Sequence, residues 1–245
     1  MAVSDELHVV FGTGAIGMAL IEDLHAEGKR VRAVDRAGRA DVPDGVEVVG
    51  GDATIDAFTK ATCADASVVY FCLNPPYASW PTLFPPLQAG VVAGAAAAGA
   101  KLIAIENTYM YGSTHGRPLT EDHPYEATTR KGRVRAQMTT DLMSAHEVGR
   151  VRVAIGRASD YFGPRGLLSA AGATVFYPAV AGKTTRLLGK PDMPHTYSYL
   201  PDIARGLAIL GARDEALGRV WHLPSAETVS TRRFVELIYE AAGQR

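Results

Sequence analysis

Three glycines near the start of the chain have the spacing of a phosphate-binding turn. Gly12, Gly14 and Gly17 form a G-x-G-x-x-G pattern directly after the apolar residues 7–11. In such a turn the first glycine permits the tight bend, the second lets the backbone approach a pyrophosphate, and the third lets helix and strand pack closely. The phosphates would meet free N–H groups at the N-terminus of the following helix. The pattern therefore predicts a dinucleotide site.

The elements around these glycines come in the order that such a site needs. An apolar strand leads into the turn, an amphipathic helix leaves it, and a second apolar strand over residues 31–34 ends at Asp35. A carboxylate at this point accepts hydrogen bonds from the adenosine ribose and repels a 2′-phosphate, which favours NAD. Arg36 follows directly and could instead hold that phosphate, so NADP stays an alternative.

Apolar, β-branched runs alternate with helical patterns through most of the chain, which predicts right-handed βαβ units and a parallel sheet. The runs that follow the second strand cover residues 46–49, 68–72, 102–105 and 151–155. We therefore expect an α/β fold, a doubly wound parallel sheet of the Rossmann type. Its binding crevice should lie at the carboxyl ends of the strands.

At 245 residues the chain is long enough for one sizeable domain with a small lobe attached. We place the dinucleotide-binding core at residues 1–165 and assign residues 166–245 mostly to a small C-terminal substrate-side lobe. A helix over 202–210 and a strand over 220–223 are expected to return from this last third to the core. A further helix is expected over 234–242.

Two proline-containing segments are predicted to be irregular, because proline removes a backbone donor and breaks helices. Residues 74–86 hold five prolines and should flank the crevice, since they follow a strand end. Residues 174–201 form the second irregular segment, and its His195 and Tyr197, before the late helix, could face the substrate.

The cofactor is expected to contact the glycine turn and the residues at the predicted strand ends. Asp52 should reach the adenine edge, with Ala53 packed against it. The full set of predicted cofactor contacts is Gly12, Thr13, Gly14, Ala15, Ile16, Gly17, Asp35, Arg36, Asp52, Ala53, Leu73, Asn74, Pro75, Lys131 and Ala158.

Composition narrows the range of partners. The formal net charge is −1 and no basic block is present, so nucleic acid and anionic membrane surfaces are not expected as partners. No run of apolar residues reaches transmembrane length, and no signal-peptide pattern opens the chain. The two cysteines, Cys63 and Cys72, lack metal-site spacing and are expected as free core thiols. We expect a cytoplasmic, metal-free protein, monomeric or homodimeric, that acts on a small molecule.

Several short motifs follow the glycine turn in a characteristic order. They are Gly51-Asp52, Tyr109-Met110-Tyr111-Gly112, the segment from Arg157 to Gly166, and Leu200-Pro201-Asp202-Ile203-Ala204. Together they resemble the short-chain dehydrogenase/reductase superfamily, in particular its extended and atypical members grouped as NAD-dependent epimerase/dehydratases. The resemblance covers nearly the whole chain, and it implies hydride transfer with a nicotinamide cofactor. The one-residue-shorter glycine turn is typical of atypical members. Extended members usually run longer, so either the lobe is minimal or a C-terminal segment is missing.

The chain departs from that family at its proton-transfer residues. Members usually carry Y-x-x-x-K, in which the lysine lowers the pKa of the phenol. Lys131 matches the lysine, but Ala127 stands in the tyrosine position, and Asn107 replaces the family's Ser or Thr. Tyr125 lies six positions before Lys131, which puts it on the opposite side of a helix or ahead of the helix.

The resemblance implies four candidate catalytic residues. Lys131 would bind the nicotinamide ribose, although it also fits a solvated face within the basic run 130–135. Tyr111 and Tyr125 are candidate proton donors with Lys131 as their cationic partner; the alternatives are a buried packing aromatic and a loop anchor. Asn107 would stand beside them.

Three functions remain open from the sequence. The first is an NAD(P)-dependent oxidoreductase, epimerase or dehydratase acting on a small polar hydroxyl or carbonyl substrate with a non-standard proton donor. The second is a redox-inert NAD(P)-binding sensor or regulator. The third is a non-redox enzyme that uses the same crevice.

Overall fold

The computed structural model describes residues 6–114, 116–187 and 189–244. The strands are β1 (Leu7–Phe11), β2 (Arg30–Asp35), β3 (Glu47–Gly50), β4 (Ala66–Phe71), β5 (Lys101–Glu106), β6 (Arg152–Arg157), β7 (Asp160–Phe162), β8 (Pro194–His195), β9 (Tyr197–Tyr199), β10 (Arg219–His222) and β11 (Val229–Ser230). The helices are α1 (Ala15–Ala26), α2 (Asp56–Thr62), α3 (Trp80–Ala98), α4 (Arg130–Glu147), α5 (Ala173–Val180), α6 (Leu200–Ala212) and α7 (Thr231–Ala241). Three short 3-10 helices are η1 (Tyr77–Ser79), η2 (Tyr109–Tyr111) and η3 (Asp214–Ala216).

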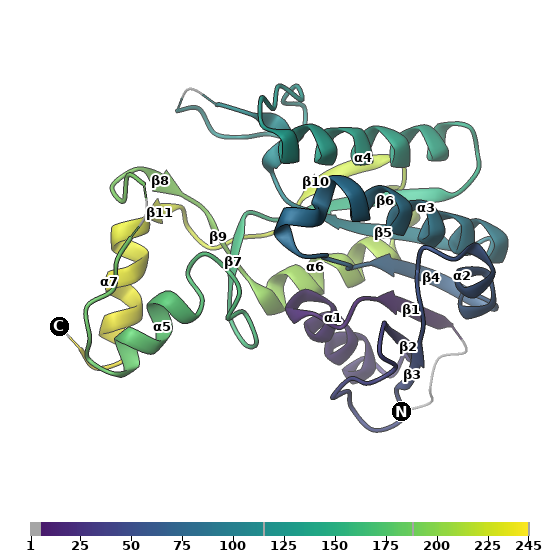
Figure 1. Cartoon of the computed structure of the whole chain (residues 1–245), viewed down its shortest axis with the longest axis horizontal. Helices are drawn as coiled ribbons and strands as arrows, with labels where there is room; N and C mark the ends of the chain where they lie inside the picture. The colour runs from purple at the N-terminus through teal and green to yellow at the C-terminus, as the bar shows by residue number, and fades with distance from the viewer. Residues whose placement is uncertain (1–5, 115, 188, 245) are drawn as a thin grey trace.

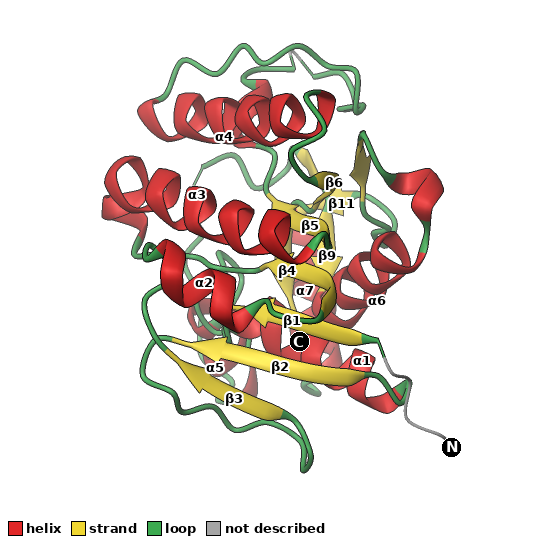
Figure 2. Cartoon of the chain, turned by 90° about the vertical axis from the view of Figure 1, so that its right-hand side faces the viewer, coloured by secondary structure: helices red, strands yellow, loops and turns green. Residues whose placement is uncertain are grey.

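A seven-stranded parallel sheet in the order β10-β6-β5-β4-β1-β2-β3 forms the core. Its strands are buried on both faces: Val9 and Phe11 of β1 belong to one apolar cluster, and Val10 between them belongs to the other. Helices α3 and α4 cover the first face, and α1 and α6 cover the second (Figure 2). This confirms the predicted doubly wound Rossmann fold. The strand order reverses between β1 and β4, which is where such sheets bind ligands.

A small C-terminal lobe projects beyond the core (Figure 1). It contains α5, α7 and two two-stranded sheets, β8–β11 and β7–β9. Its own apolar cluster is built around Val175, Tyr197 and Phe234. Between the lobe's segments the chain returns to the core, because β10 pairs with β6 and α6 packs against α1.

The prediction that residues 74–86 are irregular is wrong from Tyr77 onward. η1 and the first two turns of α3 occupy this stretch, with Pro81 in the first turn and Pro85 and Pro86 inside the helix. Proline is tolerated in a first turn, where N–H groups have no intrahelical partner. Pro85 and Pro86 do remove intrahelical bonds, and burial of the neighbouring Phe84 side chain offsets that cost.

The prediction that residues 174–201 are irregular is also wrong in part. α5 runs over residues 173–180, although it contains Pro178, and α6 already begins at Leu200. The apolar face of α5 packs against α7 in the lobe, and this tertiary packing outweighs the poor helix propensity of proline. β8 and β9 also lie in this segment.

Both cysteines are free and buried, as predicted. Burial raises the pKa of Cys63 and of Cys72 to about 12, so both are unreactive thiols. Within the described ranges, no helix is long and apolar enough to cross a bilayer. The described residues also contain no cluster of His, Cys, Asp and Glu that could hold a metal ion.

Candidate dinucleotide site

The glycine turn is built as the sequence pattern requires. Gly12 has a φ of +106°, and a Cβ atom there would lie 2.7 Å from the carbonyl oxygen of Cys72. A Cβ on Gly17 would lie 1.9 Å from the carbonyl oxygen of Gly12. Both contacts are far shorter than van der Waals distance and involve backbone atoms. Only glycine therefore lets the turn, α1 and the end of β4 pack this closely.

Gly14 is different, because a Cβ atom built on it would meet nothing within 4 Å. Gly14 is the N-cap of α1, no side chain caps that helix, and its first turn holds no acidic residue. The N-terminal N–H groups of α1, including those of Ala15 and Ile16, have no intrahelical acceptor and carry the positive end of the helix dipole. The turn therefore presents an open approach and free donors to an anion, which fits a pyrophosphate.

Asp35 stands at the end of β2 and bonds to the glycine turn itself. Thr13 Oγ1 donates to Asp35 Oδ2 over 2.8 Å, and the Ala37 N–H donates to Asp35 Oδ1 over 2.8 Å. Partial burial would raise the pKa of Asp35, but these hydrogen bonds hold it below its usual value. The carboxylate is therefore ionised at neutral pH and still has lone pairs for a ribose hydroxyl.

Asp52, Ala53 and Arg36 lie on the loops after β3 and β2. Asp52 Oδ1 accepts hydrogen bonds from Thr54 N–H at 2.9 Å and Thr54 Oγ1 at 2.8 Å, which lower the pKa of its carboxyl. Arg36 is exposed, and its charge also lowers the Asp52 pKa. Ala53 is buried, and its carbonyl oxygen fits against Gly90 of α3. This part of the crevice is thus walled by α3.

The end of β4, which leads into Leu73, Asn74 and Pro75, adjoins the glycine turn. The Leu73 backbone nitrogen would lie 3.0 Å from a Cβ on Gly12, and Asn74 is exposed. Pro75 carbonyl oxygen accepts a hydrogen bond from Trp80 Nε1 over 3.1 Å, which fixes this loop to the start of α3. Ala158 is buried at the end of β6, where its N–H donates to the Glu106 carbonyl oxygen over 3.0 Å.

Lys131 lies in the first turn of α4, and its Nζ stands 3.6 Å from the centroid of the Tyr77 ring. Tyr77 and Tyr109 are in edge contact, with ring centroids 6.5 Å apart. Asn107 Oδ1 accepts a hydrogen bond from the Tyr109 N–H over 3.1 Å. The structure thus brings Lys131 and Asn107 to one group of aromatic residues after β4 and β5.

Tyr111 and Tyr125 share one cation, and it is Arg157. Arg157 donates to Tyr111 Oη over 2.5 Å and to Tyr125 Oη over 2.6 Å. The expectation that Lys131 partners these phenols is therefore wrong. The family's spacing also fails here, because α4 begins only at Arg130 with Thr129 as its N-cap, so Ala127 and Tyr125 lie ahead of the helix.

Tyr111 itself is buried, and its Oη also lies 2.7 Å from His222 Nε2. Burial raises the pKa of Tyr111 despite the neighbouring Arg157. Burial lowers the pKa of His222, because it disfavours the charged imidazolium. These hydroxyl and imidazole groups therefore satisfy each other inside the protein.

Arg157 is anchored below these phenols by an ion pair that is almost fully inaccessible to solvent. Its Nε lies 3.1 Å from Glu106 Oε2, and Thr139 Oγ1 donates to the same carboxylate over 2.7 Å. Burial alone would lower the pKa of Arg157, but Glu106 and Tyr125 raise it above its usual value. Sequence reasoning missed this network because its members are far apart in the chain.

A second pair, also missed by sequence reasoning, joins the two small sheets of the lobe. His195 Nε2 on β8 lies 2.9 Å from Asp160 Oδ2 on β7. Asp160 lies three residues after the end of β6. Its position near a strand end was the sequence signal that could have marked it as a candidate site residue. His195 alone had been considered, with no partner assigned to it.

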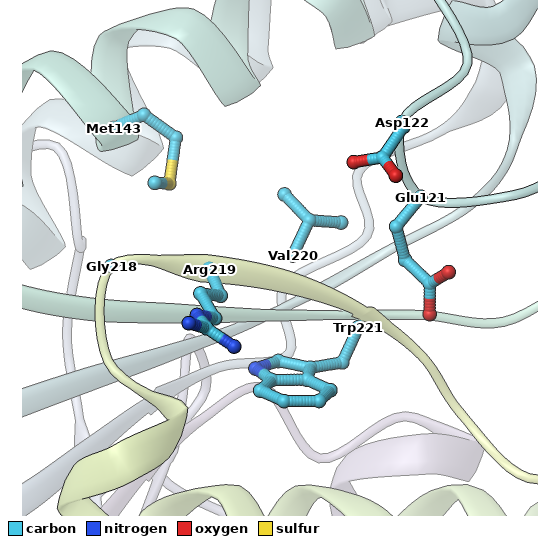
Figure 3. A pocket seen from close by; sticks show the side chains of 7 residues that line it. All are labelled: Glu121, Asp122, Met143, Gly218, Arg219, Val220 and Trp221. Carbon is cyan, nitrogen blue, oxygen red and sulfur yellow. The ribbon is translucent and has the colours of Figure 1, made fainter.

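A cavity of about 490 Å³ lies elsewhere, at the outer edge of the sheet (Figure 3). Met143 of α4, the carboxylates Glu121 and Asp122, and strand β10 with Trp221 surround it. Glu121 Oε1 accepts a hydrogen bond from the His222 N–H over 2.8 Å, so this loop covers the open edge of β10. None of the predicted cofactor residues lines it, and we assign it no part in the site.

The fold and the glycine turn define a dinucleotide-binding Rossmann protein, and comparison with known proteins narrows the class. The sequence model of the NAD dependent epimerase/dehydratase family matches residues 9–222. The chain belongs to this family. No curated protein sequence matches it.

Solved structures share the fold at low sequence identity. An epimerase from Methanothermobacter thermautotrophicus superposes with a TM-score of 0.85 at 18% identity, over 98% of this chain and 80% of that one. A dTDP-glucose 4,6-dehydratase from Streptomyces venezuelae, solved with NAD, gives 0.83 at 18% identity, over 98% and 82%. A UDP-glucose 4-epimerase from Thermotoga maritima gives 0.81 at 14% identity, over 97% and 82%.

Proposed function

We propose that this protein is an NAD-dependent enzyme that interconverts hydroxyl and carbonyl groups on a small polar substrate. The observation that carries the proposal is the glycine turn, in which Gly14 is open to approach and α1 starts without a cap. The family to which the chain belongs is named for NAD and for epimerase and dehydratase chemistry. When bound, the nicotinamide supplies reversible two-electron redox chemistry, and the protein supplies position and proton transfer.

In this proposal Gly12, Gly14 and the N–H groups of Ala15 and Ile16 hold the pyrophosphate, and Asp35 receives the adenosine ribose. Asp52 and Ala53 border the adenine. Lys131 receives the nicotinamide ribose from the other side of the crevice. A cytoplasmic location and a monomeric or homodimeric state remain predictions.

The expected cofactor preference can be tested at Asp35. Asp35→Ala should weaken NAD binding at least tenfold, which is about 1.4 kcal/mol, and weaken NADP binding less, because a carboxylate repels a 2′-phosphate. Calorimetric titration of both dinucleotides measures this. Asp44→Ala, which removes an exposed carboxylate in the connection between β2 and β3, is the matched charge control. Tighter binding of NADP by the wild type would overturn the assignment.

Lys131 provides a second test of the cofactor's position. Lys131→Ala should weaken NAD binding or turnover at least tenfold, about 1.4 kcal/mol, because it removes a donor to the ribose. Lys60→Ala, which removes an exposed lysine of α2, should leave both unchanged. If the two variants behave alike, Lys131 belongs to a solvated helix face.

A redox-inert NAD sensor is the alternative function. Ala127 in the tyrosine position and the engagement of both Tyr111 and Tyr125 hydroxyls by Arg157 favour it. The discriminating experiment mixes the protein with NAD and UDP-glucose or dTDP-glucose, and with NADH and simple aldehydes. Absorbance of the reduced nicotinamide is followed. Because epimerases and dehydratases restore NAD within each turnover, the sugar nucleotide is also analysed for epimerised or dehydrated product. Binding of NAD with neither an absorbance change nor such a product would favour the sensor.

A further inference from the structure

His195 and Asp160 form an imidazole–carboxylate pair where the lobe meets the core. The two residues come from different small sheets, and their side chains are 38% and 41% exposed. This intermediate exposure leaves both accessible to a small molecule. Exposed ion pairs between long, flexible side chains such as Lys and Glu contribute little, because holding them in one geometry costs side-chain entropy. His195 and Asp160 have short side chains and are only partly exposed.

The lobe fixes the orientation of this imidazole. Asp160 is paired with Tyr197 in the β7–β9 sheet, and His195 is paired with Val229 in the β8–β11 sheet. The His195 ring lies 4.7 Å from the Tyr197 ring, and Tyr197 stacks on Phe234 at 3.9 Å. Because Tyr197 and Phe234 belong to the lobe's apolar cluster, the imidazole rests on a rigid aromatic support.

The pair lies at the same edge of the sheet as the nicotinamide end of the proposed site. β5 and β6 are parallel with Glu106 opposite Arg157, and the Ala158 N–H donates to the Glu106 carbonyl oxygen. Tyr109, three residues after β5, and Asp160, three residues after β6, therefore follow strand ends at the same edge of the sheet.

Asp160 also contributes, after burial and the hydroxyl of Tyr77, to the raised pKa of Tyr109. The Tyr109 ring is in edge contact with the Tyr77 ring, and the Lys131 ammonium lies over the face of Tyr77. Lys131, in the first turn of α4 after β5, and Asp160, after β6, thus both follow strand ends at the edge where the proposed crevice opens.

The chemistry of the pair defines which ring nitrogen is free. A carboxylate only accepts hydrogen bonds, so His195 Nε2 carries the proton that Asp160 Oδ2 receives. In the neutral ring, Nδ1 then keeps its lone pair, and it has no hydrogen-bond partner among the described residues. An imidazole oriented in this way by a carboxylate is suited to general acid–base catalysis.

We propose that His195 is the acid–base residue of this enzyme and that Asp160 positions it. When a substrate alcohol is oxidised, the O–H bond breaks and His195 Nδ1 takes the proton. The two electrons leave the carbon with its hydrogen for the oxidised nicotinamide of the proposed function. In the reverse direction, the imidazolium returns the proton to the carbonyl oxygen. The proposal rests on that function, and it gives the missing tyrosine of the family a replacement on the lobe.

The ring-nitrogen state can be tested without turnover. Long-range ¹H–¹⁵N spectra of the whole protein, assigned with His195→Gln, should show the proton on Nε2 and a bare Nδ1. Asp160→Ala should lose this preference, while the spectra of the remaining histidines stay as in the wild type. A wild-type ring protonated on Nδ1 overturns the proposal even if the protein is active.

Turnover is measured with NAD and UDP-glucose or dTDP-glucose, and with NADH and simple aldehydes. His195→Gln should lower kcat by about 100-fold or more with NAD affinity unchanged, since proton transfer typically contributes about 10²–10⁴-fold. Asp160→Asn, nearly equal in shape, should lower kcat less, and His25→Gln on α1 serves as the control.

The outcomes separate this proposal from the function on which it rests. An active wild type and an equally active His195→Gln overturn the role of His195 alone. Loss of turnover in Tyr125→Phe, with His195→Gln unaffected, assigns the proton to the phenol instead. If the wild type gives no absorbance change and no epimerised or dehydrated sugar nucleotide with any of these probes, both proposals are contradicted together, whereas calorimetry still reports whether NAD binds.

Discussion

Glu106→Gln is expected to lower the free energy of unfolding by about 3–5 kcal/mol, the usual cost of breaking a buried ion pair from one side. The Glu106 carboxylate compensates Arg157, which lies 3.1 Å away with a fully buried side chain. It also attracts Arg135: burial holds the pKa of that guanidinium below its usual value, and the Glu106 charge opposes this shift. An amide of the same shape would leave both guanidinium groups without a countercharge.

Chemical denaturation of the wild type and the variant measures this loss. Glu22→Gln is the matched control, since Glu22 pairs with Arg165 over 2.8 Å where both side chains are more than 40% exposed. Such a pair contributes about 0–1 kcal/mol. A Glu106→Gln protein as stable as Glu22→Gln would show that the buried network contributes little. Below its melting transition, Glu106→Gln should still bind NAD, because the network lies away from the glycine turn.

Local patterns were sufficient to predict the core of this molecule. The strand residues of β1 and β4 are apolar because both faces of the sheet are covered. The predicted run ends lie within two residues of the observed ends of β1 to β6. The three glycines could be assigned separate tasks because the turn is formed by contiguous residues. Asp35 was found by the same logic, since β2 follows α1 directly.

The remainder depended on contacts between residues distant in sequence. Proline content predicted no helix at the start of α3, but packing of Phe84 and Trp80 decides the structure there, with ring centroids 5.1 Å apart. Arg157 looked like part of a motif, and nothing in the sequence indicated that it would hold Tyr111 and Tyr125. Nor could spacing along the chain pair His195 with Asp160, because two separate small sheets bring them together.

Gly14→Ala and Gly17→Ala should have opposite consequences, although each adds a single methyl group to the same turn. At Gly17 the new Cβ would lie 1.9 Å from the Gly12 carbonyl oxygen, a backbone atom that cannot move without shifting the turn. We expect a loss of unfolding free energy of about 1–3 kcal/mol or more, as in other overpacked sites. NAD affinity should fall as well, because the turn itself is displaced.

At Gly14 the methyl group meets no protein atom within 4 Å, and the φ of −71° suits alanine. Stability should therefore stay within about 0.5 kcal/mol of the wild type or rise slightly, because alanine restricts the unfolded chain. The same methyl group would stand where a pyrophosphate approaches α1, so NAD affinity should fall on the order of 100-fold, about 2.7 kcal/mol. Thermal melting and calorimetric titration of the two variants measure both quantities.

A Gly14→Ala protein that binds NAD as tightly as the wild type would mean that the dinucleotide does not lie on this turn. If Gly14→Ala instead loses NAD affinity while its stability is unchanged, misfolding cannot explain the loss. The phosphates would then be located at the start of α1.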